Sequence, residues 1–180
     1  MTAFLLSVIP EGFKELTLPD GETLLQHNCL RWAGESKMAT WKPLQLIWLE
    51  VDLTDHAGKD ADFVKFDGSI VISERAYQTL KMHTASRVEY LPVFIGGETR
   101  YILNVINVLD LMDKSRSKFK IYSDGNFGQC EHAYLNRASD DESIYKVIGF
   151  ISRVFVSDRL KSIIESESLT GSLIREYKNP

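Results

Sequence analysis

The chain has 180 residues, of which 44% are hydrophobic and 26% are charged, a composition typical of globular proteins and not of disordered ones. This length is enough for one sizeable hydrophobic core and short for two. The formal net charge of −4 and the presence of only two cysteines argue against a general nucleic-acid-binding protein and against a disulfide-stabilised scaffold.

The first third of the chain is predicted to begin with a strand from Phe4 to Ile9. No Lys or Arg precedes this apolar run and Pro10 interrupts it, so it fits neither a signal peptide nor a membrane span, and we expect a cytoplasmic protein. Pro19-Asp20-Gly21 predicts a turn, and Thr23 to Cys29 predicts a short helix. Leu44 to Val51 predicts a strand that is largely apolar on both faces.

An acidic connection follows that strand, from Glu50 to Asp67, and a second acidic group lies at 140–142. Most such segments are solvated loops. The alternative is a surface that binds a basic groove of a partner protein, because complementary charge speeds association and discourages wrong partners. The candidate partner-binding residues are Asp52, Asp55, Asp60, Asp62, Asp140, Asp141 and Glu142.

The stretch from Ile70 to Asp110 is predicted to fold as strand, helix, strand, turn and long strand. Ser73 can cap the helix, and Glu74 places negative charge at its positive end. Gly96-Gly97 predicts a hairpin turn, as Asp67-Gly68 does before it. Tyr101 to Val108 has apolar residues on both faces, which is typical of a central, covered strand.

The C-terminal region repeats the strand-to-helix pattern, because Val154-Phe-Val-Ser-Asp matches Ile70-Val-Ile-Ser-Glu. Ile144 to Ile151 predicts a strand, or a pair of strands broken near Gly149. Gly171 is suited to the left-handed position that ends a helix, and Leu173 to Tyr177 predicts an edge strand. The expected fold is one α+β domain with a mixed or antiparallel sheet, in which residues 1–60 form at most an N-terminal subdomain.

Two Cys/His pairs offer the other candidate chemistry. His27 and Cys29, brought together with Cys130 and His132, would supply a zinc-like ligand set, although their one-residue gaps differ from the usual spacing. The same residues could provide the Cys–His pair of a small hydrolase, which is the alternative function. Free thiols and surface histidines are the simpler interpretation, so we expect no metal and no cofactor.

The basic cluster from Lys114 to Lys120 could contact phosphate. A cluster of this size on an acidic chain is more often an exposed loop. We therefore expect neither a nucleic-acid nor a membrane partner.

A series of short motifs resembles a bacterial family once catalogued only as a domain of unknown function. The motifs are Val71 to Arg75, Val88 to Val93, Tyr101 to Val105 with Asp110 after it, Ile144 to Val147, Val154 to Asp158 and Leu169 to Gly171. Members of that family are immunity proteins of polymorphic toxin systems, of the Myxococcus type, and the resemblance covers Asp60 to Tyr177.

The resemblance implies a non-enzymatic protein that protects its own cell by binding and blocking a cognate toxin. The matched positions are caps, turns and strand interiors, so no toxin-contacting residue carries over from it. A general adaptor without a toxin partner is the remaining hypothesis.

Overall fold

The computed structural model describes residues 3–9, 12–27, 29, 31–49, 58–121 and 127–179, and only the backbone of residues 85, 119–121 and 127–132. Within them the strands are β1 (Phe4–Val8), β2 (Glu15–Thr17), β3 (Leu44–Trp48), β4 (Phe63–Phe66), β5 (Ser69–Ile72), β6 (Val88–Ile95), β7 (Glu98–Val105), β8 (Val108–Leu109), β9 (Lys118–Ile121), β10 (Phe127–His132), β11 (Ile144–Val147), β12 (Val154–Val156) and β13 (Ser172–Glu176). The helices are α1 (Glu74–Thr84) and α2 (Asp158–Ser166), with short 3-10 helices at Met38–Thr40 and Ala85–Arg87. The predicted α+β class is confirmed.

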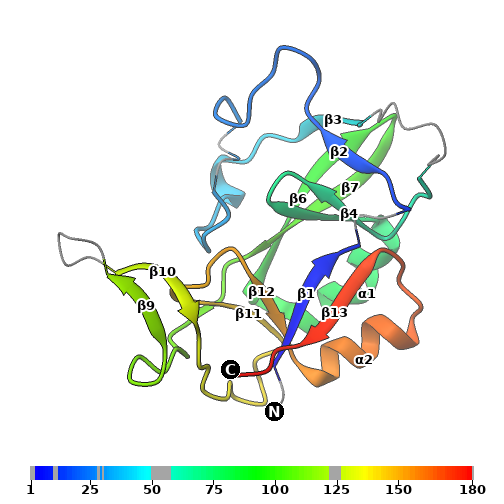
Figure 1. Ribbon diagram of the computed structural model, residues 1–180. Coiled ribbons are helices and arrows are strands. Elements are labelled where there is room, and N and C mark those ends of the chain that lie inside the picture. The colour runs from blue at the N-terminus through cyan, green and yellow to red at the C-terminus, as the bar shows by residue number, and fades with distance from the viewer. Residues whose placement is uncertain are drawn as a thin grey trace.

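A closed barrel occupies one end of the molecule (Figure 1), with its strands in the order β2-β3-β6-β7-β5-β4. Pairing is parallel between β2 and β4 and between β3 and β6, and antiparallel at the other junctions. Alternate side chains of these strands fill the interior, as small barrels require; they include Leu46, Val64, Leu91 and Val93.

A second sheet lies beside the barrel and contains both terminal strands, in the order β13-β1-β12-β11-β8. We call it the terminal sheet. The first and last strands pair directly, and Tyr177 N–H donates to the carbonyl of Ala3 at 2.8 Å, so the two chain ends lie close together (Figure 1). The β9–β10 hairpin projects to one side.

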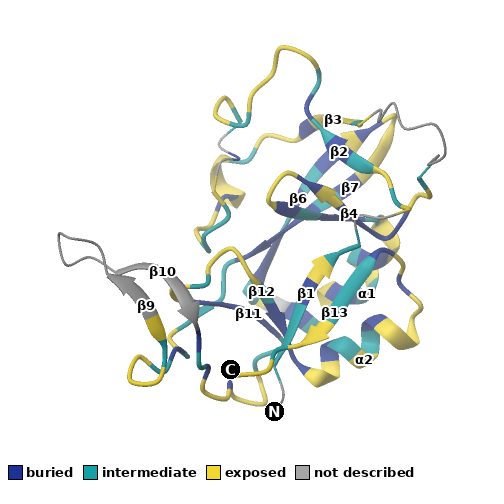
Figure 2. Ribbon diagram, viewed as in Figure 1, coloured by how far each residue is buried: buried dark blue, intermediate teal, exposed yellow. Residues whose placement is uncertain are grey.

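One hydrophobic cluster joins the barrel to the terminal sheet and to both helices. It includes Phe63 and Ile72 from the barrel, Ile144 and Val156 from the terminal sheet, and Leu160 from α2. Figure 2 shows this distribution, with buried strands in the middle of the molecule and exposed loops around them.

The local signals in the central stretch are confirmed. β4 and β5 form a hairpin across Asp67-Gly68, and β6 and β7 form one across Gly96-Gly97. Both glycines of the second turn have positive φ, 57° and 91°, which is the conformation that a two-residue hairpin turn of type I′ needs.

Both predicted serine caps are present. Ser73 Oγ accepts a hydrogen bond from Ala76 N–H at 3.1 Å at the start of α1, and Ser157 Oγ accepts one from Leu160 N–H at 3.1 Å at the start of α2. Each serine directly follows a strand, β5 or β12, so the strand–serine–helix unit occurs twice, as predicted.

Two local predictions are wrong. Residues 24–27 form a turn and not a helix, although Gln26 Oε1 accepts hydrogen bonds from the backbone and hydroxyl of Thr23 as it would at a helix start. The left-handed residue that ends α2 is Ser168, with φ 52°; Gly171 is also left-handed, with φ 82°, but it lies three residues further along the chain. Leu169 N–H donates to Ile164 O at 3.1 Å there, a pairing that satisfies a free carbonyl at a helix end.

Two strand boundaries also differ. β3 ends at Trp48, and only its inner face is covered, since Ile47 and Leu49 are 42% and 44% exposed. β7 ends at Val105, and Val108 starts the separate strand β8. Among the described residues no helix is long and apolar enough to cross a membrane.

Candidate functional site

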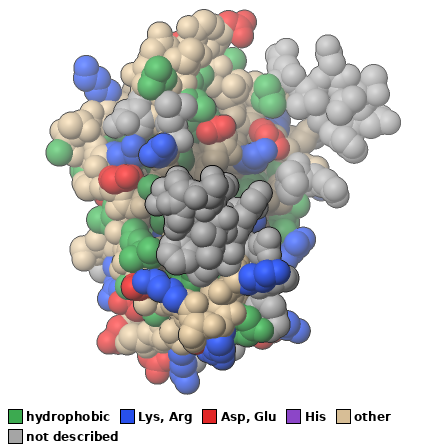
Figure 3. Space-filling view, turned by 60° about the vertical axis from the view of Figure 1, so that its left-hand side comes forward, with side chains coloured by type: hydrophobic (Ala, Val, Ile, Leu, Met, Phe, Trp, Pro, Cys, Tyr) green, Lys and Arg blue, Asp and Glu red, His purple; other side chains and the backbone are tan. Residues whose placement is uncertain are grey.

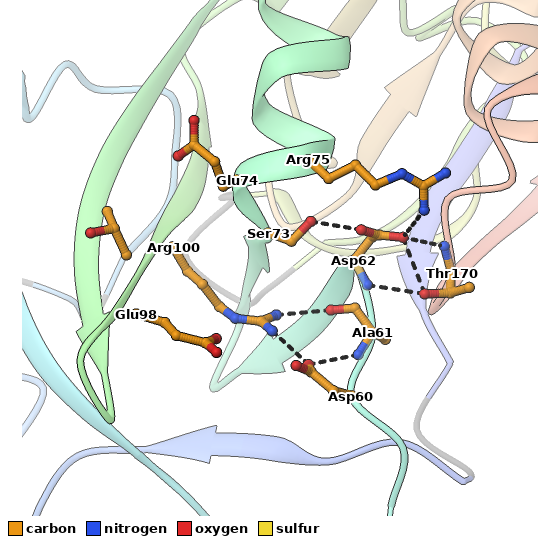
Figure 4. Close-up of a pocket in the computed structure, with 10 residues that line it drawn as sticks. Asp60, Ala61, Asp62, Ser73, Glu74, Arg75, Glu98, Arg100 and Thr170 are labelled. Carbon is orange, nitrogen blue, oxygen red and sulfur yellow. Dashed lines mark hydrogen bonds and ion pairs between the residues drawn. The ribbon is translucent and has the colours of Figure 1, made fainter.

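Asp62 lies where the barrel meets the end of α2 (Figure 4), and its side chain is only 10% exposed. Its carboxylate accepts hydrogen bonds from Ser73 Oγ at 2.7 Å and from the backbone and hydroxyl of Thr170 at 2.9 and 3.2 Å. It also pairs with the Arg75 guanidinium at 3.2 Å. This acidic residue therefore joins three segments of the fold.

Asp60 lies at the same pocket, which has a volume of about 500 Å³. It pairs at 2.6 Å with Arg100, whose side chain is 5% exposed and whose other nitrogen donates to Ala61 O at 2.8 Å. Arg100 also lies over the Trp48 ring, 5.3 Å from its centroid. Arginine side chains therefore pair with Asp60 and Asp62, two of the four acidic residues that line this pocket; the other two are Glu74 and Glu98 (Figure 4).

The second acidic group lies at the opposite end of α1, about 15 Å away along the helix. Asp140 and Asp141 are exposed and line a small pocket with His83. Glu142 is half-buried; it pairs with Arg87 and accepts a hydrogen bond from Asn107 at 2.6 Å. The predicted acidic residues therefore fall into two separate groups.

Acidic and basic side chains are interspersed on the face that Figure 3 shows. The two remaining predicted contacts, Asp52 and Asp55, lie outside the described residues.

Of the Cys/His set, the structure describes the side chains of His27 and Cys29, while those of Cys130 and His132 lie outside its description. Cys29 is fully buried, and burial raises the pKa of its thiol to about 11. A thiol with such a pKa stays protonated at neutral pH and is a poor nucleophile. His27 Nε2 lies 2.7 Å from a Glu22 carboxylate oxygen, and the described residues contain no cluster suited to a metal ion.

A cleft of about 690 Å³ lies between the barrel and the terminal sheet, and no motif in the sequence predicts it. Its apolar lining includes Leu6, Ile70, Leu103 and Val154. Among its charged lining residues Asp67 is acidic, and the rest are Lys or Arg: Arg31, Lys65, Lys146, Arg153 and Arg175. These cations come from separate parts of the chain, so no basic run in the sequence announces them.

Lys146 is the buried cation of this cleft and is 3% exposed. Its Nζ donates a hydrogen bond to Trp32 O, and it has no ion-pair partner in the described part of the chain. Burial lowers its pKa to about 8, an effect that Glu35 partly opposes. A buried ammonium without a paired carboxylate is costly, since burial favours the neutral form.

The rim cations differ in their pairing. Lys65 pairs with Glu15 at 3.2 Å. Arg31, Arg153 and Arg175 are exposed and have no ion pair or side-chain hydrogen bond to any described residue. The cleft therefore keeps an excess of positive charge on a chain whose net charge is negative.

Glu89 fixes Ser36 and Lys37, which come just after the wall residues Trp32 and Ala33 of the cleft. Its buried carboxylate accepts hydrogen bonds from Lys37 N–H at 2.8 Å, from Asn104 Nδ2 at 2.9 Å and from Ser36 Oγ. Burial opposes ionisation of Glu89, but these hydrogen bonds outweigh it and lower its pKa. Glu89 therefore anchors the chain just beyond this wall to β6, and through Asn104 to β7.

The model of an immunity protein family, Imm11, matches residues 47–179. The chain belongs to this family. No curated protein matches the sequence significantly. The Imm11 match spans β4 to β13 and includes the cleft residues Lys65, Lys146, Arg153 and Arg175, whereas Arg31 lies before it.

Proposed function

We propose that this Imm11 protein binds a cognate bacterial toxin and neutralises it by blocking its surface. The family match over residues 47–179 carries this proposal. A protein with this role needs a rigid scaffold and a loop-borne contact surface, and it needs no reactive group of its own.

The arrangement of the described side chains is compatible with such a role. The barrel and the terminal sheet share one hydrophobic cluster, which would hold a preformed surface, and preformed surfaces reduce the entropic cost of binding. The alternative hydrolase finds little support in Cys29, because its thiol is buried and has a raised pKa.

Only some of the predicted acidic contact residues are available to a partner. Asp140 and Asp141 are exposed and could attract a toxin with a basic active-site groove. Asp62 and Glu142 are occupied by hydrogen bonds within the fold, so we assign them a structural part.

The test is protection in cells. A susceptible bacterial strain would express the toxin encoded beside the gene for this chain, with or without the chain itself. We expect survival only with the chain present, and co-purification of the two proteins in a stable complex. Cell death despite soluble expression of the chain, together with no complex, would refute the proposal.

A further inference from the structure

We propose that the cleft between the barrel and the terminal sheet is the toxin-binding surface, and that it accepts an acidic segment of the toxin. The inference rests on the proposed function and adds to it the contact site and the chemistry of the partner. In this arrangement one carboxylate of the segment approaches Lys146 in the cleft, and others pair with Arg31, Arg153 and Arg175 at its rim.

The first argument is the unpaired positive charge. In the pocket at Asp60 and Asp62 both arginines are paired with carboxylates, Arg75 with Asp62 and Arg100 with Asp60. In the cleft, Lys146 has only the carbonyl of Trp32 as an acceptor among the described residues. An ammonium has three N–H donors, so Lys146 retains donors for an incoming carboxylate.

The second argument is that the cleft is built by the fold and is not a gap between surface loops. Its walls come from β1, β7, β11, β12 and β13, the β4–β5 turn and the segment that contains Trp32. The buried hydrogen bonds of Glu89 anchor residues just beyond that segment. A cation held 3% exposed among such elements is oriented before a partner arrives.

The third argument concerns size and polarity. A volume of about 690 Å³ falls in the range of sites that enclose a ligand of a few dozen atoms, which suits a short segment and not a whole domain. The apolar lining of Leu6, Ile70 and Leu103 favours a segment in which acidic and apolar side chains alternate.

A protein segment fits these features better than a nucleic acid does. Nucleic-acid binding depends on cations that follow a phosphate backbone over several nucleotides. Here the cations converge on one apolar-lined cleft, with Asp67 at the cleft and Glu15 against Lys65.

The test compares three charge-reversed variants for binding to the purified toxin encoded beside this gene, by isothermal titration calorimetry. The cleft variant is Arg153→Glu with Arg175→Glu; both side chains are exposed and make no hydrogen bond to a described residue. The control is Lys114→Glu with Lys178→Glu, which makes the same charge change on exposed residues outside the cleft. The third variant, Asp140→Lys with Asp141→Lys, tests the acidic surface. Circular dichroism and thermal melting establish that each variant is folded.

We expect the cleft variant to bind at least about 100-fold more weakly than the wild type, because like charges facing each other across an interface repel strongly. The control should stay within about threefold, and higher salt should weaken wild-type binding more than binding by the cleft variant. Unchanged affinity of the folded cleft variant would overturn the inference while leaving the proposed function intact. Loss of binding in the Asp140/Asp141 variant alone would also overturn it.

Two further outcomes separate the remaining possibilities. If the wild type fails to bind the toxin, the proposed function fails and the cleft inference fails with it. If a 20-base-pair DNA or RNA duplex displaces the toxin and binds wild type but not the cleft variant, the cleft is a nucleic-acid site and the inference is overturned.

Discussion

Asp62 directly precedes β4. Its carboxylate bonds to Thr170, in the connection between α2 and β13, and to Ser73, at the start of α1. We predict that Asp62→Ala lowers the free energy of unfolding by about 2–3 kcal/mol, because the mutation removes the carboxylate that accepts charge-assisted hydrogen bonds from Ser73, Arg75 and Thr170. Urea denaturation followed by circular dichroism measures this change.

Asp140→Ala is the matched control for that variant. Asp140 also pairs with an arginine, Arg137 at 3.3 Å, but its side chain is 76% exposed. An exposed pair of this kind contributes at most about 1 kcal/mol. Equal losses in the two variants would contradict the structural part assigned to Asp62.

Lys146 gives a pH-dependent prediction. Its pKa is lowered by burial from 10.5 to about 8, so between these values the unfolded chain binds a proton more tightly than the folded protein does. The contribution of Lys146 to the free energy of unfolding therefore rises as the pH increases from about 8 to 10.5.

We predict that Lys146→Met changes this dependence. The free energy of unfolding of the variant minus that of the wild type should be largest near pH 7 and should fall between about pH 8 and 10.5, by up to roughly 3 kcal/mol. Denaturation curves measured in parallel at several pH values test this, and a difference that is constant with pH would refute it.

In the connection from α2 to β13, the role of Gly171 is set by contacts with a distant strand and not by the neighbouring helix. Gly171 has φ 82°, and a Cβ there would lie 2.2 Å from Phe63 O and 2.7 Å from Ala61 Cβ. Its position after a helix looks like a helix-ending signal in the sequence, but Ser168 ends the helix. Gly171 instead permits β13 to approach the β4 end of the barrel.

We predict that Gly171→Ala destabilises the protein by about 3 kcal/mol or more, since backbone strain and steric overlap add. Gly21→Ala is the control, because Gly21 has φ 85° and nothing within 4 Å of its would-be Cβ. That variant should show only the strain of about 1 kcal/mol. Thermal unfolding of the two variants provides the comparison, and similar losses would mean that the contact with Phe63 is unimportant.

At the scale of the whole molecule, the barrel and the terminal sheet share the cluster that contains Phe63, Ile144 and Leu160. The first sixty residues supply β1 to the terminal sheet and β2 and β3 to the barrel. We propose on this basis that the chain folds as one unit and not as a subdomain plus a core.

The corresponding prediction is a single cooperative unfolding transition. Trp32, Trp41 and Trp48 all pack against the barrel cluster, so tryptophan fluorescence reports on the barrel, whereas far-ultraviolet circular dichroism reports on all elements. The two probes should give coincident urea transitions. A fluorescence transition that occurs at a different urea concentration from the dichroism transition would show that the barrel unfolds independently.

The amino-acid sequence by itself determined the local elements of this protein. The caps at Ser73 and Ser157, the turn at Gly96-Gly97 and the edge strand β13 were all predictable, because each depends on residues that are near in sequence. The turn after Thr23 was not, since the reciprocal hydrogen bonds between Thr23 and Gln26 are the same ones that begin a helix.

Only the tertiary structure decided which charges are compensated and which remain free. Asp60 and Asp62 look like exposed acidic residues in the sequence, yet arginines from distant strands and helices neutralise them. Lys146 lies in a β-branched, apolar context that indicates a strand, and nothing near it in sequence reveals that Arg153 and Arg175 surround the same cleft. The physical reason is that the energy of a charge depends on its burial and on its neighbours in space, and those neighbours are chosen by the pairing of the barrel with the terminal sheet.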